Sequence, residues 1–267
     1  MNKKNKLMQK FFLIAAPILA TSVLSISPSR AATFASSSSE LEFKNFSQTS
    51  SSVGTFTDTN ALVFGESGIA QATAEANAIF LQSPAFASNS NLSEAFGENQ
   101  AYLAFADSQS KIIGNFDIKA GTSFSFDFTA DLKLATSIDN PSAENARASG
   151  DIFFFLLDVD NNSVLDFFNI AGNLNTEGDN DFVGLEASSN VNLNQQSVNP
   201  NIGGLKESLQ ASVAGSFNRN FANQTNLALI EFKRNRVLVK APEPSANLAL
   251  LLSSGVIGVM IKRRRRK

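Results

Sequence analysis

Two short clusters of oxygen-bearing side chains are the candidate metal ligands of this sequence. Each places three Asp, Glu or Asn residues at alternating positions: Asp158, Asp160 and Asn162 in the first, and Glu177, Asp179 and Asp181 in the second. Calcium prefers carboxylate and carbonyl oxygens, and alternating oxygen ligands begin the calcium loop of the EF-hand. Calcium is therefore the one cofactor that the sequence suggests.

The rest of the EF-hand pattern is missing from the first cluster. Ser163 stands where the loop needs glycine, and Asn169 stands where it needs the closing glutamate. Asp and Asn also form turns by bonding to the local backbone, so a hairpin turn at 158–163 and a solvated acidic loop at 177–181 are the favoured interpretations. A single site built from both clusters requires that the two loops lie at one end of the fold.

The missing residue types exclude much catalytic chemistry. The chain has no Cys, no His, no Trp and one Tyr, Tyr102, but 24 Phe. A Ser-His-Asp triad, a thiol nucleophile and ordinary zinc, haem or iron–sulfur sites are therefore ruled out. Two carboxylates are enough for glycoside hydrolysis, but no pair of them lies in a recognisable motif. We expect a protein that is not an enzyme.

The net charge of −2 hides an acidic central part. Five of the 22 basic residues lie within the first 30 positions and six end the chain, which leaves 11 basic residues against 23 acidic ones between the termini. The central part thus carries a charge of about −12. Nucleic acid is not an expected partner, because proteins bind phosphates through Lys and Arg.

Hydrophobic alternation predicts β-strands. The segment 122–138 contains a dozen residues in which apolar and polar side chains alternate strictly, which is typical of an antiparallel strand with one solvated face. The apolar run at 152–157 predicts a strand buried on both faces, and with 164–170 it predicts a hairpin closed by the turn at 160–163. Weaker strands are expected at 41–46, 181–185, 209–217 and 227–240.

Other segments leave alternatives open or suggest loops. The segment 70–80 suits either a helix or a strand of small residues, and the segment 91–106 is also ambiguous, with a short helix as one possibility. The run of serines at 36–39 suggests a linker, and 47–54 suggests a loop. The fold prediction is an all-β, antiparallel β-sandwich with jelly-roll-like connections, spanning residues 32–240.

The first 31 residues match a secretory signal peptide. Lysines at positions 3–10 precede an apolar stretch of 14 residues at 11–24, which is shorter than the ~20 residues of a membrane-spanning helix. Small side chains at Ser29 and Ala31 predict cleavage by signal peptidase after Ala31.

The last 27 residues have three parts in order. The first holds Pro242, Glu243 and Pro244, where two prolines keep the chain extended and open to an enzyme. The second is an apolar stretch from Leu248 to Ile261, which spans about 21 Å as a helix against a hydrocarbon core of about 30 Å. The third is the basic run Lys262, Arg263, Arg264, Arg265, Arg266 and Lys267. The run predicts a cytoplasmic end by the positive-inside rule.

This arrangement resembles the PEP-CTERM sorting domain of exported bacterial proteins, over residues 241–267. The resemblance implies that a membrane protease, exosortase, recognises the tail and cuts near Pro-Glu-Pro. The chain would be tethered briefly to the inner membrane and then released to the cell surface or the extracellular matrix. The predicted function is a structural or adhesive component of the envelope or biofilm, in contact with extracellular polysaccharide. A glycan- or calcium-binding, lectin-like module is the alternative.

Overall fold

The described part of the chain is built from β-strands. The computed structural model describes residues 32–66, 68–141, 143–176, 178 and 180–242. Its strands, in chain order, are β1 (Ala32–Lys44), β2 (Ser52–Gly65), β3 (Ile69–Gln82), β4 (Ala85–Glu98), β5 (Tyr102–Ile118), β6 (Thr122–Ser137), β7 (Asn145–Asp158), β8 (Ser163–Asn175), β9 (Phe182–Ala187), β10 (Val191–Asn201), β11 (Lys206–Phe221) and β12 (Thr225–Ala241).

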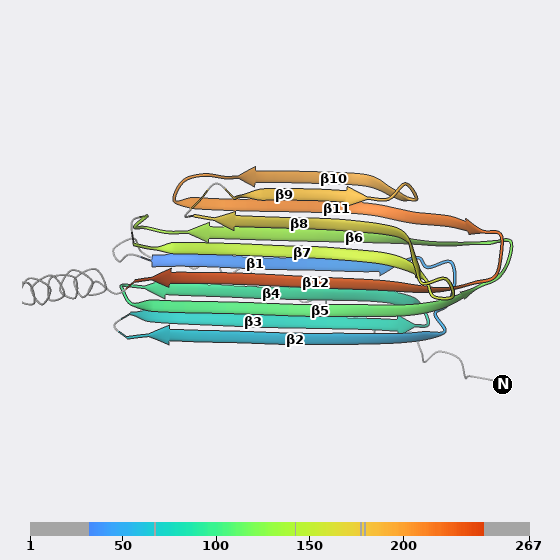
Figure 1. The fold of residues 1–267 in the computed structure, drawn as a ribbon, viewed down its shortest axis with the longest axis horizontal. Coiled ribbons are helices and arrows are strands. Elements are labelled where there is room, and N and C mark those ends of the chain that lie inside the picture. Colours follow the sequence, from blue (N-terminus) through green and yellow to red (C-terminus); the bar gives the residue numbers. More distant parts are fainter. Residues whose placement is uncertain (1–31, 67, 142, 177, 179, 243–267) are drawn as a thin grey trace, which may run out of the picture.

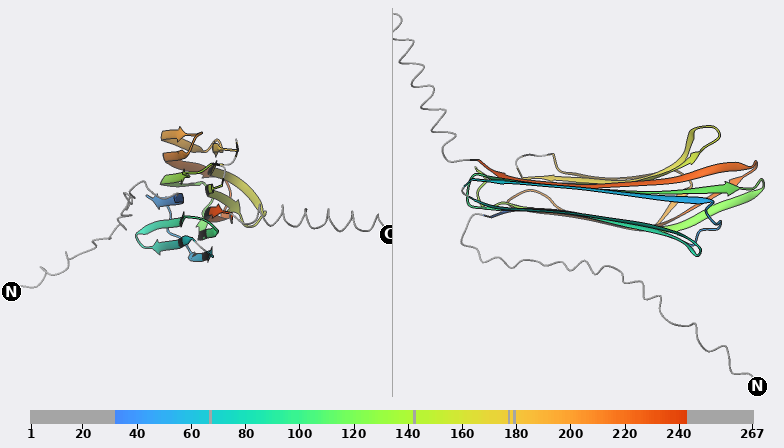
Figure 2. Two further views of the ribbon diagram at one scale, coloured as in Figure 1. Left: turned by 90° about the vertical axis from the view of Figure 1, so that its left-hand side faces the viewer. Right: turned by 90° about the horizontal axis from the view of Figure 1, so that it is seen from below.

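The strands form two sheets of six strands each that face one another (Figures 1 and 2). Sheet A has the order β10-β11-β6-β1-β4-β3, and sheet B has the order β2-β5-β12-β7-β8-β9. All strand pairs in both sheets are antiparallel. The predicted all-β, two-sheet antiparallel architecture is therefore confirmed.

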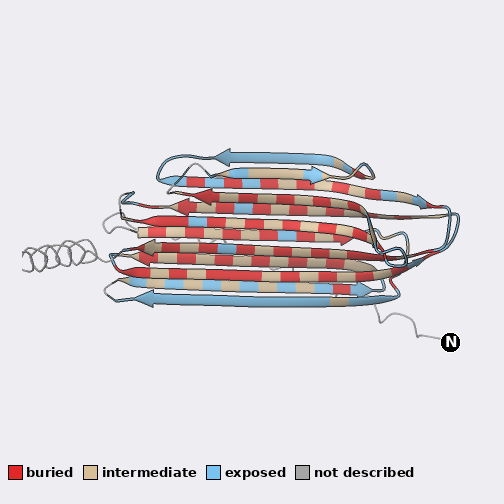
Figure 3. Cartoon of the chain, in the orientation of Figure 1, coloured by how far each residue is buried: buried red, intermediate tan, exposed pale blue. Residues whose placement is uncertain are grey.

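Strand β6 has the alternation that the sequence predicts. Its even-numbered residues from Phe124 to Leu134 are buried between the sheets, while the odd-numbered ones are half-buried or exposed. The same alternation of buried and partly exposed residues runs along the central strands of both sheets (Figure 3).

Strand β7 differs from the prediction in its burial. Ile152, Phe154 and Leu156 are buried in the interior, but Phe153 and Phe155 lie half-exposed on the outer face of sheet B. The run at 152–157 is therefore one buried row beside one outer row, rather than a strand buried on both faces. The predicted hairpin is present, because β7 pairs with β8 across the turn at 159–162.

The sequence predictions missed four strands, β2 and β10 at the sheet edges and β4 and β5 within the sheets, and they left one further segment open. β2 and β10 lie at sheet edges and are exposed along almost their whole length, so neither has a buried row that could produce alternation. The segment 70–80 is a strand, β3, and 91–106 holds parts of β4 and β5 instead of a short helix.

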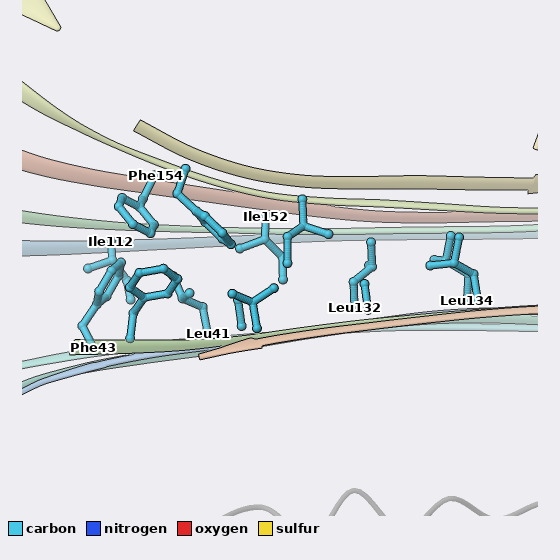
Figure 4. Close-up of a cluster of buried hydrophobic side chains, with 14 of the residues drawn as sticks. Leu41, Phe43, Ile112, Leu132, Leu134, Ile152 and Phe154 are labelled. Atoms are coloured by element: carbon cyan, nitrogen blue, oxygen red, sulfur yellow. The ribbon is translucent and has the colours of Figure 1, made fainter. Parts of the chain in front are cut away.

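Phenylalanine fills one part of the interior, next to an aliphatic part (Figure 4). The rings of the phenylalanine cluster contact one another in chains of edge and stacked pairs; its members are Phe43, Phe46, Phe80, Phe116, Phe124, Phe126, Phe128, Phe154, Phe168 and Phe217. For example, the ring centroids of Phe116 and Phe124 lie 4.6 Å apart and join the two sheets. The cluster contains ten of the 24 phenylalanines of the chain.

The predicted signal peptide and most of the predicted sorting tail lie outside the described residues. In the described part, no helix has the length and apolar character needed to span a membrane.

Candidate functional site

A group of polar side chains lies between the sheets, beside the phenylalanine cluster. This polar cluster consists of serines, asparagines, one glutamate and one lysine, all buried: Ser37, Ser39, Asn89, Asn91, Ser93, Ser108, Ser110, Glu231, Lys233 and Asn235. Its members come from β1 and β4 of sheet A and from β5 and β12 of sheet B. Buried polar side chains are costly unless they bond to one another, so a group of this size needs an explanation.

Strand β12 contributes the charged members of the cluster. Glu231, Lys233 and Asn235 are all 0% exposed and lie on the same side of the strand as Leu229 and Val237. Their partners on β5 and β7 are also buried, as in the row formed by Ser108, Asn235 and Gly150. Side chains alternate between the two faces of a strand, and the odd-numbered residues of β12 face inward. Both charged groups therefore lie in the interior.

Serines on β1 of sheet A form hydrogen bonds with the side chain of Asn235. The hydroxyl of Ser39 donates to Oδ1 of Asn235, and Nδ2 of Asn235 donates to Oγ of Ser37 at 2.6 Å. Ser37 in turn donates to the main-chain oxygen of Ser149 at 2.8 Å. The segment 36–39 is thus the middle of a central strand, and its prediction as a linker is wrong.

Strand β4 supplies two asparagines and a serine. Nδ2 of Asn89 donates to Oγ of Ser110 at 3.0 Å and also to Oε2 of Glu231. Nδ2 of Asn91 donates to the main-chain oxygens of Ser108 and Lys233, at 3.1 Å and 3.4 Å. These bonds connect the two sheets directly.

The amine of Lys233 crosses the interior to the backbone of sheet A. Nζ donates to the main-chain oxygen of Asn89 at 2.5 Å and to that of Ser39 at 3.4 Å. Lys233 therefore reaches the same residue, Asn89, whose side-chain amide contacts Glu231.

Burial changes the acidity of both charged groups. Removal from water raises the pKa of Glu231 to about 8, opposed by Lys233 and by the hydrogen bond from Asn89. Removal from water also lowers the pKa of Lys233 to about 7, opposed by Glu231 and Glu40. Near neutral pH a protonated carboxyl and a neutral amine are therefore accessible in the interior.

Three oxygens in the cluster have no hydrogen-bond partner among the described residues. They are Oδ1 of Asn89, Oδ1 of Asn91 and Oε1 of Glu231. The interior beside these unpaired oxygens is nevertheless closely packed. A Cβ at Gly150 would stand 2.6 Å from Leu132 and 3.0 Å from Ser37 Oγ. The cluster is thus tightly enclosed but incompletely bonded, a combination that is common at chemically active sites.

The first predicted metal cluster is divided between separate partners. Asp158 accepts hydrogen bonds from N and Nδ2 of Asn161, at 3.1 Å and 2.9 Å, and these bonds lower the pKa of Asp158. Asp160 instead accepts from N and Nδ2 of Asn226, at 3.3 Å and 3.0 Å. Asn162 has a φ of 49°, which is turn geometry. These contacts agree with the hairpin-turn interpretation.

The second predicted metal cluster is described in part. Asp181 accepts a hydrogen bond from the main-chain nitrogen of Asn175 at 2.7 Å and borders an open pocket that Glu207 also lines. Glu177 and Asp179 lie outside the described residues. The loop before β9 and the turn before β8 are separated by the length of β8 (Figure 1), or about 40 Å at ~3.3 Å per residue. The two clusters therefore do not meet at one end of the sandwich.

No group of three or more Asp, Glu, His or Cys side chains suited to a metal ion occurs among the residues described. Calcium binding stays a prediction.

Of the predicted processing and anchor residues, Pro242 alone is described. It is exposed and directly follows β12. Ala31, Glu243, Pro244, Leu248, Ile261 and Arg263–Arg266 lie outside the described residues.

Comparison with protein-family models, with curated proteins and with solved structures gave no match.

The sequence predictions did not find the polar cluster, although one signal for it is present. Glu231 and Lys233 have the parity of Leu229, Val237 and Val239, all of which are buried. Extending that parity along β12 would place the two charges in the interior. β1 and β4 give no such signal, because serine occurs on both faces of each strand.

Proposed function

We propose that this chain is the precursor of an exported protein that is trimmed at both ends and acts as a structural or adhesive component of the cell surface or matrix. One observation carries the proposal: the folded body fits between the two predicted processing sites. β1 begins at Ala32, one residue after the predicted signal-peptidase site, and β12 ends at Ala241, directly before Pro242. Cutting at either place would leave every strand intact.

A contact at the first strand supports cleavage after Ala31. The main-chain nitrogen of Ala32 lies 3.0 Å from Oδ2 of Asp139. After cleavage this nitrogen would be a charged α-amino group, and the contact would become an ion pair at the protein surface.

The edge of sheet B supports a structural or adhesive role. β2 pairs with β5 on one side and is an edge strand, and its outer row exposes Phe56, Leu62 and Phe64 at 56%, 54% and 67%. An edge strand with exposed apolar side chains is a template for pairing with another chain. We further propose jelly-roll-like connections between the strands of the body.

The lectin-like alternative has less support. Sugar-binding platforms favour Tyr and Trp rings, and Tyr102 is not available as one. Its ring is buried, its hydroxyl bonds to Oγ1 of Thr33 at 2.5 Å, and burial raises its pKa to about 12. A glycan array probed with and without calcium tests this alternative, and specific, competable binding would favour it over the structural role.

Processing of the tail is tested by substituting the motif in the native host. Replacing Pro242 and Pro244 with alanine should leave the tail attached and keep the protein in the membrane fraction. Replacing Pro200, an exposed proline on β10, is the matched control and should leave processing unchanged. Release of the double variant at the wild-type rate would contradict the proposal, as would a mature protein that starts at Met1.

A further inference from the structure

Three chemically complementary groups meet inside the polar cluster: an amine, a carboxyl and a carboxamide. Nζ of Lys233 contacts the main-chain oxygen of Asn89 at 2.5 Å, and Oε2 of Glu231 accepts a hydrogen bond from the carboxamide nitrogen of the same asparagine. Glu231 and Lys233 are fully buried, and Asn89 is 2% exposed. The amine and the acid thus reach a single asparagine in a place that bulk water does not enter.

The interior also favours the protonation states that acyl transfer needs. A neutral amine is a nucleophile, whereas an ammonium ion is not, and burial lowers the pKa of Lys233 toward neutrality. Burial likewise keeps the carboxyl of Glu231 protonated near neutral pH, so it can serve as an acid. Two further carboxylates act on this pair through their charge, Asp151 on Glu231 and Glu40 on Lys233. Both lie on the outer faces of neighbouring strands, Asp151 on β7 and Glu40 on β1.

Among the asparagines of the cluster, Asn89 is the one placed to react. The side chain of Asn235 is held at both ends by Ser37 and Ser39, and the amide nitrogen of Asn91 is bound to two main-chain oxygens. The amide nitrogen of Asn89, by contrast, already bonds to the carboxyl of Glu231, and Oδ1 of Asn89 has no partner in the described part of the chain.

We propose that Lys233 and Asn89 form an intramolecular amide cross-link between β12 and β4, with Glu231 as the acid–base group. The lone pair of Nζ attacks Cγ of Asn89, and the Nζ–Cγ bond forms. The protonated carboxyl of Glu231 gives its proton to Nδ2, and the resulting carboxylate then takes a proton from Nζ. The Cγ–Nδ2 bond then breaks, and Nδ2 leaves as ammonia. The carboxyl is regenerated, and no oxidant, reductant or cofactor takes part.

The reaction requires Nζ of Lys233 to move from the main-chain oxygen of Asn89 to the side chain of the same residue. Nζ already touches the main chain of Asn89, so rotation about the Lys233 side chain moves it from that oxygen toward Cγ, to the ~3–3.5 Å separation of a reactive conformer. The product would join the two sheets covalently and close a loop between residues 144 positions apart. A chain without cysteine would thereby gain a cross-link comparable in effect to a disulfide. This inference does not rest on the proposed function.

Peptide mass spectrometry of the folded, full-length chain tests the cross-link. After denaturation and trypsin digestion, the peptide from Asn45 to Lys111 should appear joined to the peptide from Asn220 to Arg234, lighter than their sum by one ammonia. Cleavage after Lys233 should be lost, because trypsin does not cut after an acylated lysine. Separate peptides with an unmodified Asn89 from the folded wild-type chain would overturn the proposal, whatever the variants do.

Two variants and a control assign the roles. Lys233→Met should remove the joined peptide, and Glu231→Gln should lower its yield at least tenfold, because the amide keeps the size of the side chain but is no acid. Asn91→Ala, a neighbour in the cluster, should retain the link. Full linkage in folded Glu231→Gln protein would refute the role of the acid, and loss of the link in folded Asn91→Ala protein would refute the choice of asparagine.

Discussion

The phenylalanine cluster and the polar cluster occupy neighbouring parts of one interior, and strands β1 and β5 contribute side chains to both. In the first, rings such as Phe43, Phe126 and Phe154 contact one another with centroids 5.3 to 5.8 Å apart and need no particular partner. In the second, each group depends on a specific partner, as Asn235 depends on Ser37 and Ser39. Burial of apolar area therefore stabilises the phenylalanine cluster, whereas directional hydrogen bonds hold the polar cluster together.

The difference indicates what the polar cluster contributes. A buried apolar row excludes a one-residue slip of a strand, because the slip would turn that row toward solvent. Interchangeable apolar side chains distinguish less well between shifts of two residues, which keep the same face buried. Pairs such as Asn89 with Glu231 exist only when β4 and β12 have one relative position. We infer that the polar cluster fixes how the two sheets are aligned and that the phenylalanine cluster supplies most of the free energy.

The largest expected effect tests the apolar side of this comparison. Phe126→Ala should lower the free energy of unfolding by about 3–5 kcal/mol, because it removes a ring that packs against Phe43 and Phe217. Ser93→Ala removes hydrogen bonds to Ser108 and Asn235 and should cost about 1 kcal/mol. Urea denaturation measures both, and an equal or reversed order would contradict the division of roles.

The charges of the polar cluster should give the unlinked protein an unusual pH dependence. Asn89→Ala cannot form the cross-link but keeps Glu231 and Lys233. The raised pKa of Glu231 favours folding below its ordinary value of 4.5, and that contribution is lost as the pH rises toward about 8. The lowered pKa of Lys233 favours folding above its ordinary value of 10.5, and that contribution is lost as the pH falls toward about 7. Stability of the variant should therefore pass through a minimum between about pH 7 and the pKa of Glu231, which loss of the Asn89 hydrogen bond raises further.

The slope on each side of this minimum should be at most about 1.4 kcal/mol per pH unit for one group. Urea denaturation of the Asn89→Ala protein from pH 5 to 10 measures it. The control adds Glu231→Gln and Lys233→Met to the same background and should give a flatter curve. A minimum of the same depth in the control would show that other groups cause it.

A smaller effect is expected from added volume beside the polar cluster. Gly150→Ala should cost about 1–3 kcal/mol, because the new methyl group would approach Leu132 and Ser37 too closely. Gly184 on β9 is the matched control: a Cβ there meets no atom within 4 Å, so Gly184→Ala should change stability by less than about 0.5 kcal/mol. Thermal unfolding compares the two, and similar losses would show that the interior beside Gly150 adapts.

How far the sequence predicts the structure depends on whether a strand has one buried apolar row. β6 does, and its inward residues from Phe124 to Leu134 follow from alternation alone. β2 and β10 have no buried row, so local pattern cannot distinguish them from loops. The outer row of β7 misleads for the opposite reason, because Phe153 and Phe155 are apolar although they face outward.

The polar cluster is harder to predict because it depends on tertiary contacts. Asn89 and Glu231 are 142 positions apart, and nothing in either local sequence indicates that they touch. The serines of β1 resemble a linker until Asn235 and Ser149 are known to lie opposite them. The parity of β12 was the one available signal, and it points to Glu231 and Lys233 without naming their partner.

The intact mass of the folded wild-type protein, compared with that of Lys233→Met prepared in the same way, tests the chemistry of this interior most directly. After correction for the substitution, the wild-type chain should be lighter than the variant by one ammonia, whichever residues form its two ends. Equal corrected masses would contradict the account, since the amine, acid and carboxamide would then meet without reacting.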